Sequence, residues 1–197
     1  MKYSVILAHP TSGSYNHAIG DVVQRGIRAR GGEVFYHDLY AERFDPVMPT
    51  EEIPKNAILP EAIENHCREI ESADGIVIIH PNWWSQPPAI LKGWVDRVLR
   101  PGRAYNFVAD ETGEVKPVGL LKAKVGLVIN TANTPQEKEV SLLGDPQAVF
   151  WEKVVFGLCG VRHVRRLVFS PVIVSTPEQR RCWLEETRYS VDQILGS

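Results

Sequence analysis

Cysteine is scarce in this sequence, and the few cysteines present form no motif. The 197 residues include three of them, Cys67, Cys159 and Cys182, and no two have Cys-x-x-Cys spacing. An odd number without that spacing argues against a disulfide framework. Each cysteine falls in an apolar or helical stretch, so we interpret all three as reduced packing residues of a cytoplasmic protein.

The chain also lacks a strong net charge and a long apolar run. Its 22 basic and 24 acidic residues leave a net charge of -2, which excludes the electrostatic footprint of a nucleic-acid-binding protein. No apolar run approaches the ~20 residues that span a bilayer. The strand after Met1 and Lys2 is too short for a signal sequence. We therefore expect a cytoplasmic single domain over residues 1–197, not embedded in a membrane and without a nucleic-acid partner.

Two common phosphate-binding motifs are missing, and so is a metal motif. The sequence contains neither Gly-x-Gly-x-x-Gly nor Gly-x-x-x-x-Gly-Lys-(Ser/Thr), which argues against a Rossmann-type dinucleotide site and against an ATPase. His37, His66 and His163 have no metal-ligand spacing. We assign no metal, and we interpret His66 as a residue on a helix surface.

Apolar runs and helical periodicity alternate along the chain. Strands are predicted at residues 3–8, 33–39, 76–79, 124–130 and 164–169, and helices at about 17–27, 61–73, 89–99, 145–158 and from 177 onward. Residues 40–60 form a long connection with at most a short helical turn near Glu51. Residues 100–119 form an extended arm or hairpin, with Tyr105 and Phe107 on one side.

This alternation predicts an α/β fold with a doubly wound parallel sheet. A flavodoxin-like strand order, 2-1-3-4-5, fits best, with helices on both faces. In that order the loops after the first, third and fourth strands meet at the carboxyl edge of the sheet, where open α/β sheets bind ligands. These three loops are also the ones with unusual composition.

The loop after the third strand is aromatic and rich in proline. It reads His80-Pro81-Asn82-Trp83-Trp84-Ser85-Gln86-Pro87-Pro88, a composition that can hold backbone N–H groups rigidly against a planar ring such as a flavin. The alternative is that Trp83 and Trp84 are core or interface aromatics.

The loop after the first strand is rich in hydroxyl groups and leads into a helix. Ser12, Ser14, Asn16 and His9 are candidate donors to a phosphate, because the free N–H groups and the dipole of a helix N-terminus favour an anion. The alternative is simple N-capping by Ser14 or Asn16.

With these residues in view, the sequence resembles the NAD(P)H:quinone oxidoreductases of flavodoxin-like fold, a family that includes bacterial drug-modulator and potassium-efflux ancillary flavoproteins. The most specific match is the pattern Pro-x-x-Trp-x-x-x-Pro-Ala-Ile-Leu-Lys-Gly-Trp-x-Asp-Arg-Val over residues 81–98. Ala8-His9-Pro10 with Ser14-Tyr15-Asn16 resembles the family's phosphate loop, and residues 104–107 resemble its aromatic arm.

The resemblance implies a role for each matching position. The flavin, FMN or FAD, would be held by a set of residues from the three loops: His9, Ser14, Tyr15, Asn16, Pro81, Asn82, Trp83, Trp84, Ser85, Thr131, Ala132, Asn133 and Thr134. A backbone N–H near Trp84 would point at the flavin N5, and the Asn133 amide would steady the reduced ring. Tyr105 and Phe107 would wall the place where nicotinamide and acceptor bind in turn, above the flavin of the partner subunit in a homodimer.

Two departures from the family pattern are visible. Thr131-Ala132-Asn133-Thr134 replaces the usual Thr-Thr-Gly-Gly, and residues 135–145 lack the His and Tyr that some members use as an acid/base pair.

The implied activity is a two-electron, ping-pong transfer of hydride from NADH or NADPH through the flavin to a quinone or a similar acceptor. The catalytic positions would be Trp84, Tyr105, Phe107 and Asn133. Two alternatives stay open: a regulatory flavoprotein subunit of a potassium-efflux transporter, and a small electron-carrier flavodoxin.

Overall fold

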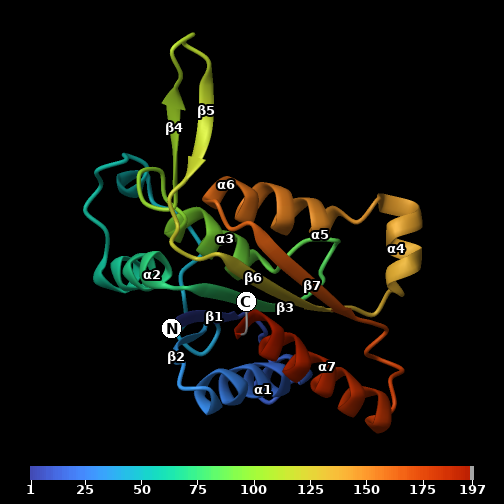
Figure 1. The fold of residues 1–197 in the computed structure, drawn as a ribbon. Helices are drawn as coiled ribbons and strands as arrows, with labels where there is room; N and C mark the ends of the chain where they lie inside the picture. Colours follow the sequence, from blue (N-terminus) through green and yellow to red (C-terminus); the bar gives the residue numbers. More distant parts are fainter. Residues whose placement is uncertain (196–197) are drawn as a thin grey trace.

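The centre of the molecule is a parallel sheet of five strands. The structure, a computed structural model, describes residues 1–195. The sheet order is β2-β1-β3-β6-β7, which is the predicted 2-1-3-4-5 order once the hairpin strands β4 and β5 are left out of the count (Figure 1). The bounds are β1 Lys2–Leu7, β2 Glu33–Asp38, β3 Gly75–Pro81, β6 Val125–Thr131 and β7 His163–Phe169.

Helices cover both faces of this sheet, so every residue of the central strands β3 and β6 is buried. Helices α1 (Tyr15–Ala29) and α7 (Pro177–Leu195) pack on one face. The other face is covered by α2 (Glu61–Ser72), α3 (Ala89–Val98) and a continuous helix made of α5 (Pro146–Ala148), the π-helical η2 (Val149–Phe156) and α6 (Gly157–Cys159). These helices match the predicted ones within a few residues, apart from the π-helical turns.

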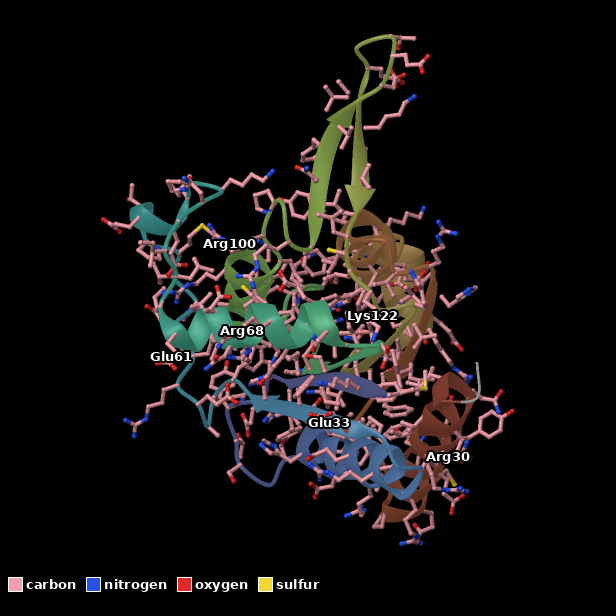
Figure 2. All side chains as sticks on the ribbon, turned by 60° about the vertical axis from the view of Figure 1, so that its left-hand side comes forward. Arg30, Glu33, Glu61, Arg68, Arg100 and Lys122 are labelled. Carbon is pink, nitrogen blue, oxygen red and sulfur yellow. The ribbon has the colours of Figure 1, made fainter. Side chains whose placement is uncertain are left out.

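An antiparallel hairpin, β4 (Tyr105–Ala109) with β5 (Val115–Gly119), projects from the body (Figure 1). The Tyr105 and Phe107 rings lie 5.8 Å apart, edge to face, so their predicted shared side is confirmed. The hairpin carries exposed apolar side chains, and Figure 2 shows it extending away from the packed side chains of the sheet and helices. These apolar residues are Phe107, Val108, Val115 and Val118.

The long connection between β2 and α2 contains one short helical turn, η1 (Thr50–Glu52), as predicted. Two arginines at the end of α3 hold it. Arg97 binds the buried Glu52 carboxylate through two nitrogens, at 3.0 and 2.5 Å. Arg100, labelled in Figure 2, donates to the backbone oxygens of Glu52 and Pro54. The connection is therefore ordered by buried charges that the sequence pattern did not reveal.

Two features differ from the sequence expectations. Helix α4 (Gln136–Leu143) was not predicted, because none of its residues is buried and its apolar periodicity is weak. Cys67 and Cys159 are buried as expected, but Cys182 is exposed, so its interpretation as a packing residue was wrong.

Within residues 1–195, no helix combines the length and the apolar character needed to cross a membrane.

Candidate functional site

A cavity of about 730 Å³ lies where the predicted loops meet, at the carboxyl ends of β1, β3 and β6. This volume is within the range of small-molecule and cofactor sites, about 300–1,000 Å³. All the residues that the resemblance assigns to flavin binding line the cavity except Ser14, and Ser12, the other serine predicted as a phosphate donor, does not line it either. Those that line it are His9, Tyr15, Asn16, Pro81, Asn82, Trp83, Trp84, Ser85, Thr131, Ala132, Asn133 and Thr134.

The loop after β3 has an unusual backbone. Trp84 and Ser85 both adopt positive φ, 55° and 57°, a conformation that bulky residues seldom adopt outside functional sites. The Trp83 N–H donates to Gln86 O, and the Gln86 N–H donates back to Trp83 O, both at 3.0 Å. Within residues 1–195 the N–H groups of Trp84 and Ser85 have no acceptor. Consecutive free N–H groups form a concave donor site for an electronegative atom.

The two tryptophans of this loop are not core residues. Trp83 is 42% exposed and Trp84 is 99% exposed. The core alternative is therefore wrong, and both indoles border the cavity.

The loop after β1 ends at the N-terminus of α1. The Thr11 N–H donates to Nδ1 of His9 at 3.1 Å, which leaves Nε2 to carry the proton of the neutral ring. Burial lowers the pKa of His9 and outweighs the contact between its Nδ1 and the Thr11 carbonyl oxygen, which raises that pKa. The Asn16 side chain is buried and donates to Thr131 Oγ1 at 2.9 Å, which ties α1 to β6.

Neither Ser14 nor Asn16 caps α1 with its side chain. Ser14 occupies the N-cap position but makes no capping hydrogen bond, and its hydroxyl pairs with His17 Nδ1 at 2.8 Å. Asn16 is already inside the helix. The simple-capping alternative is therefore wrong, and the first N–H groups of α1 stay free for a ligand.

The cavity wall at α7 contains a cation. The Arg180 guanidinium lies 5.8 Å from the centre of the Tyr15 ring, and the Tyr15 hydroxyl donates to Arg180 O at 2.8 Å. Burial raises the pKa of Tyr15, so its phenol stays neutral and acts as a donor. Arg180 is fixed further by Ser175 Oγ at 2.8 Å.

The segment after β6 departs from the family pattern without backbone strain. Residues 131–134 include no positive φ, so the missing glycines are not required for that conformation. Asn133 Oδ1 accepts the Ile173 N–H at 3.0 Å. Its Nδ2 therefore remains available to a ligand in the cavity.

Sequence reasoning missed one wall of the cavity. The missed residues come from α4 and the β7–α7 region: Lys138, Glu139, Leu142, Leu143, Val172 and Arg180. Pro135 and Gly144, which flank α4, are helix start and stop signals that could have indicated this helix.

The buried His80 holds the loop after β3 in place by hydrogen bonds. His80 has no exposed surface, and burial lowers its pKa to about 4, so the ring is neutral. Its Nδ1–H donates to Pro81 O at 2.8 Å. Its Nε2 accepts from Trp151 Nε1 at 2.9 Å and from Asn130 Nδ2 at 2.7 Å. Both ring nitrogens are thus used to hold the start of the tryptophan loop.

Tyr105 and Phe107 do not line this cavity in the same chain. Tyr105 instead borders a second, smaller cavity of about 220 Å³ beside α3 and η2. The four predicted catalytic residues therefore divide into two groups: Trp84 and Asn133 at the cavity, and Tyr105 and Phe107 on the hairpin.

A separate cluster joins β2 to α2 away from the cavity. His66 is only 6% exposed, so its interpretation as a surface residue was wrong. Trp94 Nε1 donates to His66 Nδ1 at 3.2 Å, which leaves the proton on Nε2, 3.5 Å from Glu42. His37 bridges Glu42 and Glu69 at 2.9 and 2.5 Å. His37, Glu42 and His66 are close enough to serve as metal ligands. Because Nε2 of His66 carries a proton, we interpret the cluster as a network of hydrogen bonds and ion pairs.

This network predicts how stability depends on pH. Burial lowers the pKa of His37, but its bonds to Glu42 and Glu69 outweigh burial and raise it above 6.5. At Glu42, burial raises the pKa of the carboxyl group, yet the bonds to His37 and His66 outweigh burial and lower that pKa from 4.5 to about 2. The stabilisation is therefore complete between pH 4.5 and 6.5; it is lost as pH rises through the raised His37 pKa and as it falls toward 2. Urea titrations at a series of pH values test this. The His37→Gln variant should not lose stability as pH rises above 6.5, whereas the exposed His163→Gln variant should lose it as the native protein does.

Comparison with known proteins agrees with this geometry. Residues 1–189 match the model of a family described as having a flavodoxin-like fold. An uncharacterized NAD(P)H oxidoreductase of Haemophilus influenzae is 34% identical, with 94% of this chain and 91% of that protein covered. NAD(P)H dehydrogenase [quinone] 1 of Cavia porcellus is 32% identical over 53% of this chain and 45% of its own length.

Solved structures give the same fold. The Streptococcus mutans protein Smu.1420 has a TM-score of 0.83 and 28% identity, with 97% of this chain and 98% of that chain covered. An FMN-dependent NADH-azoreductase of Bacillus anthracis, solved in complex with FMN, has a TM-score of 0.75 at 16% identity, with 98% of both chains covered. The chain belongs to the family described by the flavodoxin-like fold, and over nearly its whole length it is similar to an NAD(P)H oxidoreductase.

Proposed function

We propose that this protein is a flavin-dependent NAD(P)H:quinone oxidoreductase. The observation that carries the proposal is the pair of free N–H groups at Trp84 and Ser85, held at positive φ on the wall of the 730 Å³ cavity. A backbone of this kind suits the acceptor atoms along one edge of a flavin. The named relatives, an NAD(P)H oxidoreductase and an NAD(P)H dehydrogenase [quinone], support the same assignment.

The residues at the cavity suit FMN, which is the flavin we propose. The free N–H groups at the start of α1, with His9 nearby, would bind its phosphate. The 81–85 loop and the Asn133 amide would bind the ring. The cofactor, when bound, accepts hydride from NAD(P)H and passes it to the acceptor. We propose that nicotinamide and quinone use the same space in turn, which predicts ping-pong kinetics.

The protein itself orients the loops of the site and stabilises the negative charge that develops in the reaction. His80 fixes the entry to the loop, and Asn16 holds the α1 loop against β6. The Trp84, Ser85 and Asn133 donors are preorganised toward developing negative charge, which is the usual source of electrostatic stabilisation in an enzyme.

The test of this function starts from the purified protein. It should be yellow, release FMN on denaturation, and oxidise NADH or NADPH with a benzoquinone, giving parallel lines in initial-rate plots. A colourless protein that neither FMN nor FAD can reconstitute would contradict the proposal. Co-purification with a membrane transporter and very slow turnover would instead favour the regulatory role.

Substitution of Trp84 tests the role of the loop backbone. Proline has no N–H and cannot adopt the φ of 55° found here. Trp84→Pro should therefore weaken FMN binding by about tenfold or more. Trp84→Ala keeps the N–H and should weaken binding less, and Trp84→Gly also relieves the strained φ. Fluorescence titration of FMN measures all three, and equal affinity of the proline and glycine variants would contradict the backbone role.

We also propose a cytoplasmic homodimer. The exposed apolar hairpin and the position of Tyr105 and Phe107 outside their own cavity support it, because a partner subunit could bring these rings over the flavin. Light scattering should give twice the chain mass of 22.1 kDa. Phe107→Ser should raise the KM for the acceptor if the ring walls the partner's cavity.

A further inference from the structure

Unpartnered polar atoms gather behind the large cavity. In the part of the chain that the structure describes, five buried side-chain N or O atoms have no hydrogen-bond partner, whereas most such atoms in proteins do. Four of them belong to residues that line one small cavity of about 10 Å³ beneath α4. These four are Asn82 Oδ1, Glu139 Oε1, Gln147 Nε2 and Arg166 Nε.

The four atoms are complementary to a water molecule. Two are acceptors and two are donors, while water offers two hydrogens and two lone pairs. The cavity is at the lower limit of the volume that one water needs, about 10–15 Å³. Gln147 is 2% exposed and the Arg166 side chain 9% exposed, so bulk solvent does not reach them.

The side-chain amides cannot be turned to satisfy these atoms in another way. Asn82 must direct its Nδ2 at Glu139 Oε2, 2.6 Å away. Gln147 must direct its Oε1 at Asn130 Nδ2, 3.3 Å away. Arg166 is held through its other nitrogens by Asp145 and Asn130, and its Nε lies 3.9 Å from a Glu152 carboxylate oxygen, beyond hydrogen-bond distance. The four side chains are therefore held in place by their neighbours, and all four line the small cavity.

Helix α4 depends on this region for its attachment. None of its residues is buried, and Figure 1 shows it at the far end of the molecule from α2. Its side-chain link to the sheet is the Asn82–Glu139 bond, supplemented by the Gln136 N–H bond to Ser170 Oγ at 3.2 Å. Yet α4 supplies Lys138, Leu142 and Leu143 to the large cavity.

We propose that the small cavity binds one water molecule, and that this water and Asn82 together make Glu139 the positioning residue for the acceptor-binding wall of the large cavity. The water joins Glu139 to Arg166, so that a buried cation and an amide fix both carboxylate oxygens. Leu142 and Leu143 are 69% and 58% exposed at the cavity, which suits the apolar face of a planar quinone. The assignment of this wall to the acceptor rests on the proposed function.

The kinetic test compares three variants of the FMN-loaded enzyme. Glu139→Ala removes both bonds and should raise the KM for menadione about tenfold, a larger change than in kcat or in FMN affinity. Glu139→Gln keeps an oxygen for Asn82 and should restore part of the loss. Glu137→Ala, an exposed neighbour on α4, is the matched control. A fall in kcat at unchanged KM, or the same effect from Glu137→Ala, would overturn the proposal.

A second test does not require flavin or activity. In the flavin-free protein, amide hydrogen exchange over residues 137–143 should be faster for Glu139→Ala than for the native chain and for Glu137→Ala. A high-resolution crystal structure should show a water within hydrogen-bond distance of Arg166 Nε and Glu139 Oε1. Unchanged exchange, or a dry cavity, would refute the water anchor. A wild-type protein without flavin or NAD(P)H oxidation would refute the proposed function alone.

Discussion

Glu52→Ala should lower the free energy of unfolding by about 3–5 kcal/mol, because it leaves a buried guanidinium without its counter-charge. Glu52 is 2% exposed and the Arg97 side chain 6% exposed. The Glu52 carboxylate holds Arg97 through two nitrogens and raises the pKa of that guanidinium despite its burial. Without it, Arg97 keeps Asp45, through the backbone oxygen at 2.5 Å and the exposed carboxylate at 3.8 Å, and the Phe44 ring, whose centre is 5.7 Å from its guanidinium carbon.

Chemical denaturation measures this loss, and the neighbouring Glu51→Ala is its control. Glu51 belongs to the same helical turn but is exposed, so its removal should change stability by no more than about 0.5 kcal/mol. If Glu52→Ala and Glu51→Ala proved equally mild, Arg97 would have to find another partner in the folded state.

Gly93→Ala should destabilise the fold by about 3 kcal/mol, at the upper end of the usual cost of overpacking. Gly93 lies within α3, where alanine is ordinarily the better residue. A methyl group at this position would lie 2.2 Å from the backbone oxygen of Pro46 and 2.4 Å from its Cβ. The glycine of the Ala-Ile-Leu-Lys-Gly-Trp motif is thus explained by close approach of the 40–60 connection, not by backbone conformation.

Thermal and urea unfolding of Gly93→Ala can be compared with Gly26→Ala in α1. There the added methyl would meet a Val191 side-chain carbon at 3.1 Å, and a flexible side chain can move where a backbone oxygen cannot. We expect Gly26→Ala to stay within about 1 kcal/mol of the native stability. Similar losses in the two variants would show that helix α3 can shift away from Pro46.

The sequence alone determined the fold class and the three loops of the site. Unbroken apolar runs such as residues 76–79 are buried on both faces in a parallel sheet, and their alternation with amphipathic helices restricts the strand order. Because parallel strands end at one edge, the loops after β1, β3 and β6 had to meet. The individual flavin-binding residues were predicted from the family resemblance: twelve of them line the cavity, and Ser14, whose hydroxyl pairs with His17, does not.

Only the tertiary structure decided the rest, since it depends on contacts between segments far apart in the chain. The positive φ of Trp84 and Ser85 is held by a loop closed on itself and supported by His80. Helix α4 has no buried face, so its sequence shows no apolar periodicity that would predict it. Its Glu139 nevertheless accepts a hydrogen bond from Asn82, which is 57 residues away in the sequence. His66 and Arg97 become buried only because Trp94 and Glu52 are brought to them. Burial of a polar side chain is a property of its distant partners, and no local pattern records it.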